Sequence, residues 1–426
     1  MDWWVGAVLP DISEKILRPA LVGLLACLIC VASIRLLVLV AVEPSKPHKL
    51  KLHYRPSSLS KRLLSTLPAL RASYSVPGCW THFVAGPARS VLILIATAAT
   101  QLCTRWTGQV CFLREYLLMN DGGLVSLDWA RIPGQQQQLL TLFPFSNQEE
   151  EEESRRSSSS SVSWIVILLP GFWVCNSKRN LQNVCLSLVD QGHRPVIWNR
   201  RGHDGTPMTD CRPTDVAGGG PCTSDLRQVI CYLSNQHPNS PLALLGFSHA
   251  ASLLISYLGE FGSSSLIHSA VAVSPLWQHL PAGLEWILSA CKGIQRPDYR
   301  SADPLRDSDD IAVPLLVVHY DDDPLVPAKT LPLELFSLYP QLLLVTCPLG
   351  GHCGQLQPTP LADVIIGDFF HQVLAFTSWP LPAAEQQQQS KHCQQGKRKR
   401  VRSLTRTSTR KPRRHLKNGR PSCSSC

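Results

Sequence analysis

The sequence of 426 residues lacks several patterns that mark common protein classes. It contains no N-x-Ser/Thr acceptor site for N-glycosylation, which favours a cytosolic folded part, because a lumenal domain of this size often carries one. Its 16 cysteines show no paired metal-ligand spacing. The two Cys-x-x-Cys matches, Cys27/Cys30 and Cys423/Cys426, lie in an apolar run and at the extreme C-terminus. We therefore predict no metal site and no cofactor.

Excess basic charge is absent from most of the chain, although the formal net charge is +10. Thirteen of the 41 Lys and Arg side chains lie in residues 386–426, which hold no Asp or Glu, so 28 basic and 31 acidic side chains remain elsewhere. Nucleic-acid binding by this near-neutral body is not expected. Residues 381–426 are disordered by composition, and we expect this basic tail to bind anionic lipid at a membrane surface. A nuclear or RNA-binding role of the tail is the alternative.

One apolar stretch, residues 20–42, follows an N-terminal segment of residues 1–19. Its 23 residues hold a single charge, Arg35, and are enough to cross a bilayer core. We predict a single-pass signal-anchor helix in the endoplasmic reticulum or plasma membrane; the alternative is the cleaved signal peptide of a secreted protein. More Lys and Arg follow the stretch than precede it, which favours a cytosolic body.

The part of the chain between the apolar stretch and the basic tail falls into two regions of different composition. Residues 43–75 are basic and contain Pro and Ser, as a juxtamembrane linker does, and one folded domain is expected over residues 76–380. Within that domain, residues 132–163 carry runs of Gln, Glu and Ser that cannot build a core, so a disordered insertion is predicted there. Two strand-like runs flank the turn sequence of residues 120–123, which predicts a hairpin over residues 114–130.

From residue 164 onward, short apolar runs alternate with amphipathic stretches. Strands are predicted over residues 164–171, 194–202, 242–248, 267–275, 313–323 and 341–351, and helices over residues 180–192, 223–238, 249–262, 332–340 and 361–379. This alternation predicts an α/β fold with a mostly parallel sheet and helices on both faces. In such folds the functional residues gather at the carboxyl ends of the strands.

Three polar residues follow predicted strand ends in the order Ser, Asp, His. Ser248, in "LLGFSHAAS", closes a strand just before a helix, as a nucleophile elbow requires; a serine that caps the helix is the alternative. Asp323 ends the strand of residues 313–323, and His352 lies in a glycine-rich loop after the next strand. A serine that a histidine deprotonates, with an acid orienting the histidine, performs nucleophilic acyl transfer.

Backbone amides near Ser248 are candidates for binding the negative charge that develops on an acyl oxygen. Gly171 and Phe172 follow the first buried strand, and His249 follows the serine itself. We predict that the N–H groups of Phe172 and His249 form an oxyanion hole, with an ordinary strand-to-helix turn at Gly171 as the alternative.

Together these motifs resemble the membrane-anchored, lipase-like branch of the α/β-hydrolase domain-containing proteins. The shared elements are Pro170-Gly171, "NRRGHDG" (199–205), "SDLRQVI" (224–230), "YLGE" (257–260), "DPL" (303–305), "DDP" (322–324) and "GGHCG" (350–354). The likeness covers residues 75–380 and implies the α/β-hydrolase fold and hydrolysis of the acyl esters of lipids. It assigns the nucleophile to Ser248, the base to His352 and the acid to the Asp322/Asp323 pair, of which Asp323 has the better spacing to Val326.

Two features depart from the pattern of that branch. Ala250 stands in place of the second glycine of the elbow, and only residues 275–302 separate the strand ending at Ser274 from Asp303, where the branch has a longer helical lid. Two functions therefore stay open. One is a membrane-anchored serine hydrolase that acts on lipid esters; the other is a weakly active or inactive hydrolase fold that tethers a signalling protein at the membrane.

Overall fold

The computed structural model of the chain describes residues 48–67, 70, 73–74, 109–133, 163–171, 178–207, 223–278, 303–354 and 361–376, all within the unit Met1–Pro380. The expected membrane helix (20–42), nearly all of the insertion (132–163), most of the shortened lid (275–302) and the basic tail (381–426) lie outside these residues. Within the described ranges, no helix has both the length and the apolar character needed to span a bilayer.

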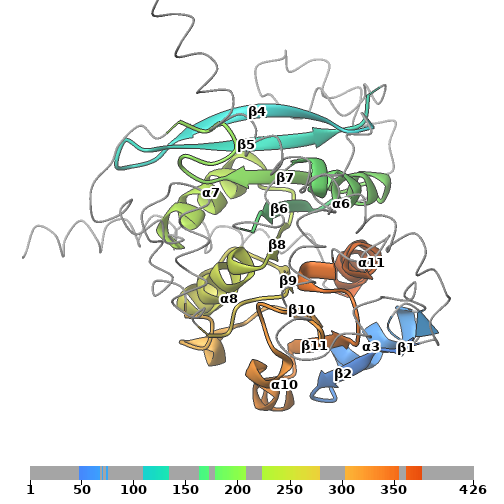
Figure 1. The fold of residues 1–426 in the computed structure, drawn as a ribbon. Coiled ribbons are helices and arrows are strands. Elements are labelled where there is room, and N and C mark those ends of the chain that lie inside the picture. The colour runs from blue at the N-terminus through green and yellow to red at the C-terminus, as the bar shows by residue number, and fades with distance from the viewer. Residues whose placement is uncertain are drawn as a thin grey trace, which may run out of the picture. The chain divides into compact units, whose positions relative to one another are not determined.

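Nine strands form one sheet (Figure 1). Their order is β2 (Lys51–Tyr54), β11 (Leu342–Cys347), β10 (Leu315–Tyr320), β9 (Ser269–Val273), β8 (Leu242–Phe247), β6 (Ile165–Leu169), β7 (Arg194–Asn199), β5 (Leu124–Arg131) and β4 (Cys111–Leu118). The strands from β11 to β7 run parallel, whereas β2 and β5 are antiparallel to their neighbours in that group and β4 is antiparallel to β5. The predicted strands and the hairpin are confirmed. A separate ladder joins β1 (His48–Lys49) and β3 (Ser73–Tyr74).

Helices cover both faces of the sheet. On one face, α3 (Ser58–Thr66), α6 (Lys178–Asp190) and α11 (Leu361–Phe376) contribute to one buried apolar cluster with the strands. On the other face, α7 (Thr223–Gln236) packs beside α8 (His249–Phe261), and α8 lies along β8 and β9 (Figure 1). The short helix α10 (Leu333–Leu338) contacts β2 and β11. The predicted layering is confirmed, and it explains why the central strands are continuous apolar runs rather than alternating ones.

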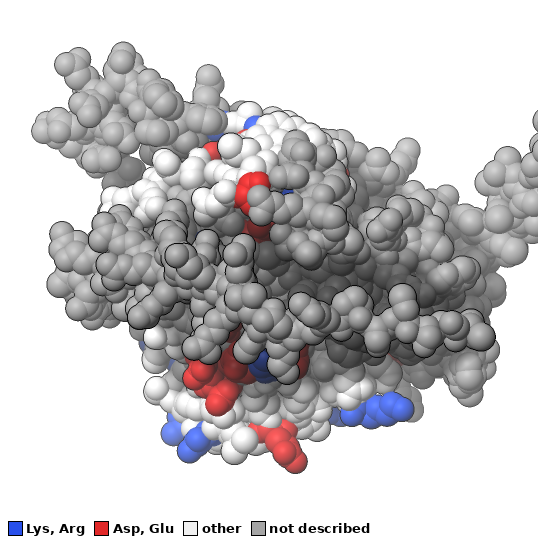
Figure 2. Space-filling view, turned by 90° about the vertical axis from the view of Figure 1, so that its left-hand side faces the viewer, with Lys and Arg blue, Asp and Glu red and all other residues white. Residues whose placement is uncertain are grey.

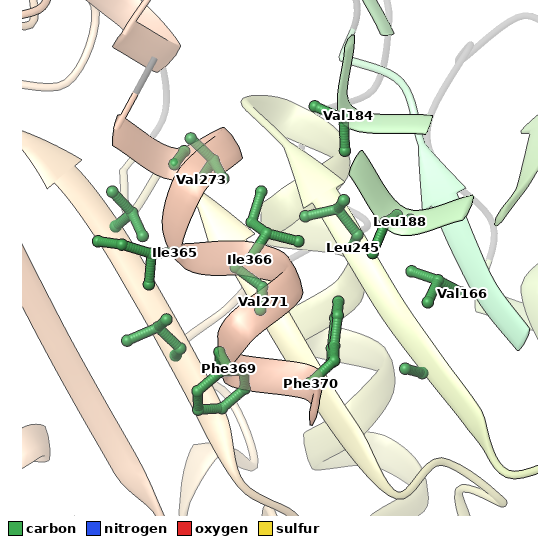
Figure 3. Close-up of a cluster of buried hydrophobic side chains, with 14 of the residues drawn as sticks. Val166, Val184, Leu188, Leu245, Val271, Val273, Ile365, Ile366, Phe369 and Phe370 are labelled. Atoms are coloured by element: carbon green, nitrogen blue, oxygen red, sulfur yellow. The ribbon is translucent and has the colours of Figure 1, made fainter. Parts of the chain in front are cut away.

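The core between the sheet and the helices α6 and α11 is built from aliphatic and aromatic side chains. In Figure 3, Ile365, Ile366, Phe369 and Phe370 of α11 face strand residues such as Val271. All five side chains are buried. Full burial of such side chains contributes roughly 1.5–3 kcal/mol each relative to exposure, so this layer holds α11 against the sheet.

The strand order reverses between β6 and β8. From β6 the chain continues outward to β7 on one side, whereas β8, β9, β10 and β11 extend in sequence on the other side. In open parallel sheets, ligands bind outside the carboxyl ends of the strands at such a reversal, because the two adjoining crossover connections leave in opposite directions. Gly171 follows β6 and Ser248 follows β8, so the sequence-predicted residues lie at this point of the sheet.

The interpretation of residues 43–75 as a linker is wrong for the residues that the structure describes. Residues 51–54 form β2, which pairs with β11, and residues 58–66 form α3. Leu59, Leu63 and Leu67 are buried in the core, while Lys61 and Arg62 stay exposed. The basic side chains Lys61 and Arg62 thus occupy the solvent face of an amphipathic helix, and the folded domain includes residues 51–67.

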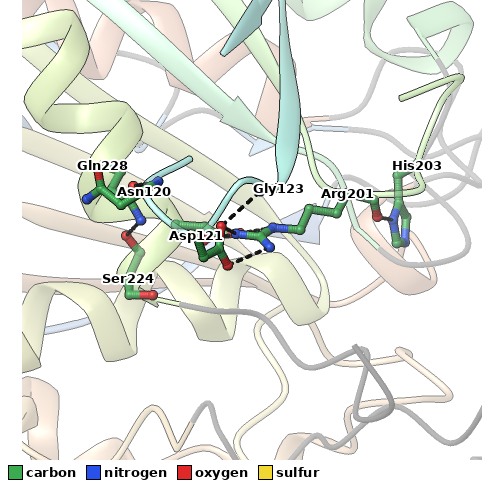
Figure 4. Close-up of polar contacts among 8 residues, drawn as sticks. Asn120, Asp121, Gly123, Arg201, His203, Ser224 and Gln228 are labelled. Atoms are coloured by element: carbon green, nitrogen blue, oxygen red, sulfur yellow. Dashed lines mark hydrogen bonds and ion pairs between the residues drawn. The ribbon is translucent and has the colours of Figure 1, made fainter. Parts of the chain in front are cut away.

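Polar contacts tie the segment after β7 to the β4–β5 hairpin (Figure 4). Both terminal nitrogens of Arg201 donate to the carboxylate of Asp121, at 2.8 and 2.9 Å, and the guanidinium also donates to Asp225 of α7. Asp121 in turn accepts a hydrogen bond from the Gly123 amide at 3.0 Å. The "NRRGHDG" element therefore joins the hairpin turn to a helix through paired charges, which hold the pKa of Asp121 below its usual value.

The described surface carries charges of both signs. On the face seen in Figure 2, neither Lys and Arg nor Asp and Glu cover a broad continuous area of the described residues. Ion pairs such as Lys51 with Asp321, at 3.4 Å, are solvent-exposed and contribute little, about 0–1 kcal/mol. This distribution fits the near-neutral body that the charge count predicts.

His193, in the turn before β7, makes stability depend on pH. The side chain is 2% exposed, and neither ring nitrogen has a hydrogen-bond partner in the described part of the chain. Burial, with a smaller effect of nearby His371, lowers the pKa of His193 from 6.5 to about 4. The unfolded chain then binds this proton more readily. The contribution to stability is present above pH 6.5 and is lost as the pH falls toward 4, by up to about 1.4 kcal/mol per pH unit.

We expect His193→Gln to reduce the difference between the unfolding free energies measured in urea at pH 7.5 and at pH 5. Glutamine does not titrate, so its own cost of burial is the same at both pH values. An unchanged pH difference in the variant would contradict the assignment of this proton uptake to His193.

Candidate active site

Ser248 occupies the turn between β8 and α8 in a strained conformation. Its φ is 56° and its ψ is −129°, outside the regions that residues with a side chain favour. The side chain makes no hydrogen bond to the first turn of α8, so the interpretation as a helix-capping serine is wrong. A strained serine between a buried strand and a helix is the geometry of a nucleophile elbow, which exposes the hydroxyl at the carboxyl edge of the sheet.

The strand β8 and the helix α8 cross closely at Gly246, one of the two small residues of the elbow; the other is Ala250. A Cβ atom on Gly246 would lie 2.9 Å from both the Ala250 carbonyl oxygen and the Ala251 Cα, so a larger residue cannot fit without movement of the backbone. Ala250 itself lies inside α8 and is 1% exposed. Its methyl group is accommodated in the helix, where alanine is the most favourable residue.

A continuous chain of hydrogen bonds joins Ser248, His352 and Asp323. The distance from His352 Nε2 to Ser248 Oγ is 2.7 Å, and the distance from His352 Nδ1 to Asp323 Oδ2 is also 2.7 Å. The exposed fractions of the three residues are 7%, 0% and 4% in the same order. The structure thus brings together three side chains that are 75 and 29 residues apart along the sequence.

The acid in contact with the histidine is Asp323. Its second oxygen, Oδ1, accepts hydrogen bonds from the amides of Leu325 at 2.9 Å and Val326 at 3.1 Å. Burial opposes ionisation, but His352, His319 and the Leu325 amide outweigh it and hold the pKa of Asp323 below its usual value. Asp323 is therefore a carboxylate that can accept a hydrogen bond from Nδ1 of the imidazole and stabilise its protonated form.

The loop that carries His352 is held by contacts to the segments that follow β10 and β9. Asp322 Oδ1, in the loop after β10, accepts a hydrogen bond from the Gly351 amide at 2.8 Å. Ser274 Oγ, after β9, accepts one from the Cys353 amide at 3.2 Å. Both residues next to His352 are therefore held through their backbone.

The side chain of Tyr320 packs against the same loop. A Cβ on Gly350 would lie 2.3 Å from the tyrosine ring, and a Cβ on Gly354 would lie 2.4 Å from its hydroxyl oxygen. Gly354 also has a φ of +73°, which side-chain-bearing residues rarely adopt. The buried tyrosine thus explains two glycines of "GGHCG" as close-approach positions around His352.

Of the residues around the predicted oxyanion hole, the structure describes Gly171 and His249. Gly171 approaches the elbow so closely that a Cβ there would lie 3.0 Å from the Phe247 oxygen and 3.1 Å from the Ser248 Cβ. His249 begins α8, where amide groups have no acceptor within the helix. Phe172 lies outside the described residues. The two segments predicted to supply the donors therefore meet at Ser248.

His249 is a second histidine beside the serine, but it is not suited to act as the base. Burial, with an added effect of the positive charge on Arg200, lowers the pKa of His249 to about 3. The ring is 4% exposed and neutral near pH 7, where a group with this pKa is too weak a base to share the serine proton effectively.

Within the described ranges, no three His, Cys, Asp or Glu side chains are arranged to hold a metal ion. Sequence reasoning missed three supporting residues, Ser274, Tyr320 and Asp322, whose partners are distant in sequence. Only the glycines flanking His352 signalled close packing around that loop.

The sequence is similar to those of several characterised proteins. Protein ABHD15 of Homo sapiens is 29% identical over 372 residues, which cover 74% of this chain and 72% of that protein. Phospholipase ABHD3 of Mus musculus is 24% identical over 303 residues, which cover 58% of this chain and 67% of that protein. The motif-based resemblance, to α/β-hydrolase domain-containing protein 15 in particular, is confirmed by the first match. No family model matches the chain.

Solved structures of esterases are also similar. The esterase Pf2001 of Pyrococcus furiosus aligns with a TM-score of 0.43 and 17% identity, over 63% of this chain and 94% of that one. Est1E of Butyrivibrio proteoclasticus with bound ferulic acid aligns with a TM-score of 0.43 and 16% identity, over 61% of this chain and 99% of that one.

Proposed function

We propose that this chain, whose fold is that of the α/β-hydrolases, is a serine hydrolase that cleaves the acyl esters of lipids. One observation carries the proposal: the unbroken hydrogen-bond chain from Ser248 through His352 to Asp323, with 2.7 Å at both steps. Its members follow three different strands, so chance proximity along the sequence does not account for their contact.

In the proposed reaction, His352 Nε2 takes the proton of the Ser248 hydroxyl as Oγ bonds to the acyl carbon. Asp323 stays ionised and stabilises the imidazolium that forms. The carbonyl oxygen becomes negative and is held by the amides of His249 and Phe172. When the intermediate collapses, the alcohol leaves with the proton from His352. Water, deprotonated by His352, then attacks the acyl-enzyme, and the fatty acid and the free serine are released.

The alternative, an inactive scaffold, is less consistent with the energetics of these residues. A serine at a φ of 56° lowers the stability of the fold. A scaffold would gain nothing from a strained serine whose hydroxyl contacts a buried histidine. This contact supports an active enzyme.

The proposal also covers the class of substrate and the location of the chain at a membrane. Relatives named as phospholipases, such as mouse ABHD3, favour an acyl ester in a lipid. We also propose that residues 20–42 anchor the chain in a membrane, because they form an apolar stretch with a single charge, and that the basic tail binds anionic lipid there. Both would keep the site close to lipid esters.

The test is ester hydrolysis by the full chain, compared with Ser248→Ala. We expect the wild type to release fatty acid from phosphatidylcholine and 4-nitrophenol from 4-nitrophenyl butyrate, and Ser248→Ala to lower kcat at least ~10⁴-fold. Ser256→Ala, in the helix α8 that follows Ser248, is a matched control. Its buried hydroxyl has no hydrogen-bond partner in the described structure, so its loss should change kcat less than twofold.

Two results would count against this function. Equal hydrolysis by wild type and Ser248→Ala would place the reaction elsewhere. A folded wild type without hydrolysis of either ester would favour the membrane-tethered scaffold. Hydrolysis of the short ester alone would contradict the lipid substrate class while leaving the serine mechanism intact.

A further inference from the structure

Three consecutive aspartates after β10 have three different partners. Asp321 forms a solvent-exposed ion pair with Lys51 at 3.4 Å. Asp322 accepts a hydrogen bond from the Gly351 amide at 2.8 Å. Asp323 accepts the hydrogen bond of His352. The loop after β10 therefore contacts the loop after β11 at two adjacent residues, once through the backbone and once through the side chain of the histidine.

The Asp322 contact, together with the Ser274 contact, holds a loop of irregular backbone. Gly351, Cys353 and Gly354 have φ values of 66°, 55° and 73°, so the loop around His352 adopts left-handed backbone at three positions. Glycine-rich segments lose more conformational entropy on ordering than other segments do. A hydrogen bond to a carboxylate is about twice as strong as one between neutral groups, and it fixes the amide directly before the histidine.

We propose that Asp322 is a positioning residue that clamps the histidine loop and so keeps His352 within hydrogen-bond reach of both Ser248 and Asp323. This inference rests on the proposed serine hydrolase function. It divides the aspartate pair by role: Asp323 stabilises the charge on the imidazole, and Asp322 determines where the imidazole is.

Loss of the clamp has a defined kinetic consequence. The three catalytic side chains remain, but His352 spends less time in the productive position. Displacements of about 1 Å at a catalytic group lower rates up to about 100-fold. We therefore expect kcat to fall about 10- to 100-fold in Asp322→Ala, with KM for 4-nitrophenyl butyrate changed less than threefold.

The experiment compares three variants of the full chain. Asp322→Ala removes the acceptor, and Asp322→Asn keeps an oxygen that can accept from the Gly351 amide. Asp321→Ala removes the neighbouring carboxylate, which forms an exposed ion pair with Lys51. kcat is expressed per active site titrated with a fluorophosphonate, so a merely less stable variant keeps its kcat. We expect Asp322→Asn to regain most of the kcat and Asp321→Ala to match the wild type.

A second readout does not depend on activity. Hydrogen–deuterium exchange of the peptide covering residues 349–354 should be faster in Asp322→Ala than in the wild type or Asp321→Ala. The inference is overturned if Asp322→Ala keeps wild-type kcat and exchange, or if Asp322→Asn is as impaired as Asp322→Ala. A wild type without Ser248-dependent hydrolysis refutes the proposed function, whereas the exchange result still decides whether Asp322 holds the loop.

Discussion

Replacing Asp323 with Asn is expected to lower kcat for ester hydrolysis about 10³- to 10⁴-fold. Asn has nearly the same shape, so the hydrogen bonds from the Leu325 and Val326 amides to the side-chain oxygen can remain. The amide has no negative charge to stabilise the imidazolium of His352. It can also donate to Nδ1 and so favour the tautomer that carries its proton on Nε2, which cannot take the serine proton. The measurement is kcat for 4-nitrophenyl butyrate per titrated active site.

Asp321→Asn is the control for this substitution. It makes the same chemical change two residues earlier, at a carboxylate that contacts solvent-exposed Lys51 rather than His352. Its kcat should stay within twofold of the wild type. A loss of less than tenfold in Asp323→Asn, or equal losses in the two variants, would contradict the role given to Asp323.

Gly246→Val is expected to destabilise the fold by about 3 kcal/mol, the upper end of the usual cost of overpacking. The obstructing atoms, the Ala250 carbonyl oxygen and the Ala251 Cα at 2.9 Å, belong to the backbone of α8, so no side chain can rotate away. The helix must move from β8, and Ser248 moves with it. The measurements are the unfolding free energy in urea and the hydrolytic activity, both of which should fall.

Gly192→Ala provides the comparison for this second substitution. A Cβ at Gly192 meets nothing within 4 Å, and only its φ of +81° opposes a side chain, so the expected cost is about 1–2 kcal/mol without loss of kcat. If Gly246→Val were as stable and active as Gly192→Ala, the close crossing of strand and helix at the elbow would be incorrect.

The parallel sheet and the main site residues could be predicted because β6, β8, β9, β10 and β11 are buried, mostly apolar runs, and Ser248, Asp323 and His352 follow three of them. In a parallel sheet, consecutive strand ends share one edge, so Ser248, Asp323 and His352 could be expected together before their distances were known. The spacing from Asp323 to Val326 also indicated which aspartate of the pair is the acid. The Val326 amide donates to Asp323, which explains why this aspartate rather than Asp322 turns toward His352.

Other parts of the structure have no recognisable pattern in the sequence. Residues 51–66 resemble a linker in composition because their Lys and Arg are on the solvent side, and four residues of β2 are too few to show a clear strand period. The contacts of Ser274, Tyr320 and Asp322 join loops after different strands. Such contacts depend on how two loops pack against each other, which the local sequence of neither loop determines.

The central claim, that Ser248 is the nucleophile of a serine hydrolase, is tested most directly by locating a covalent adduct. The full chain is reacted with a fluorophosphonate and digested, and the modified residue is identified by mass spectrometry. The account predicts one phosphonyl group per chain, on Ser248, with its formation strongly slowed in His352→Ala. Absence of an adduct on folded wild-type protein, or an adduct on another residue that forms equally in Ser248→Ala, would contradict it.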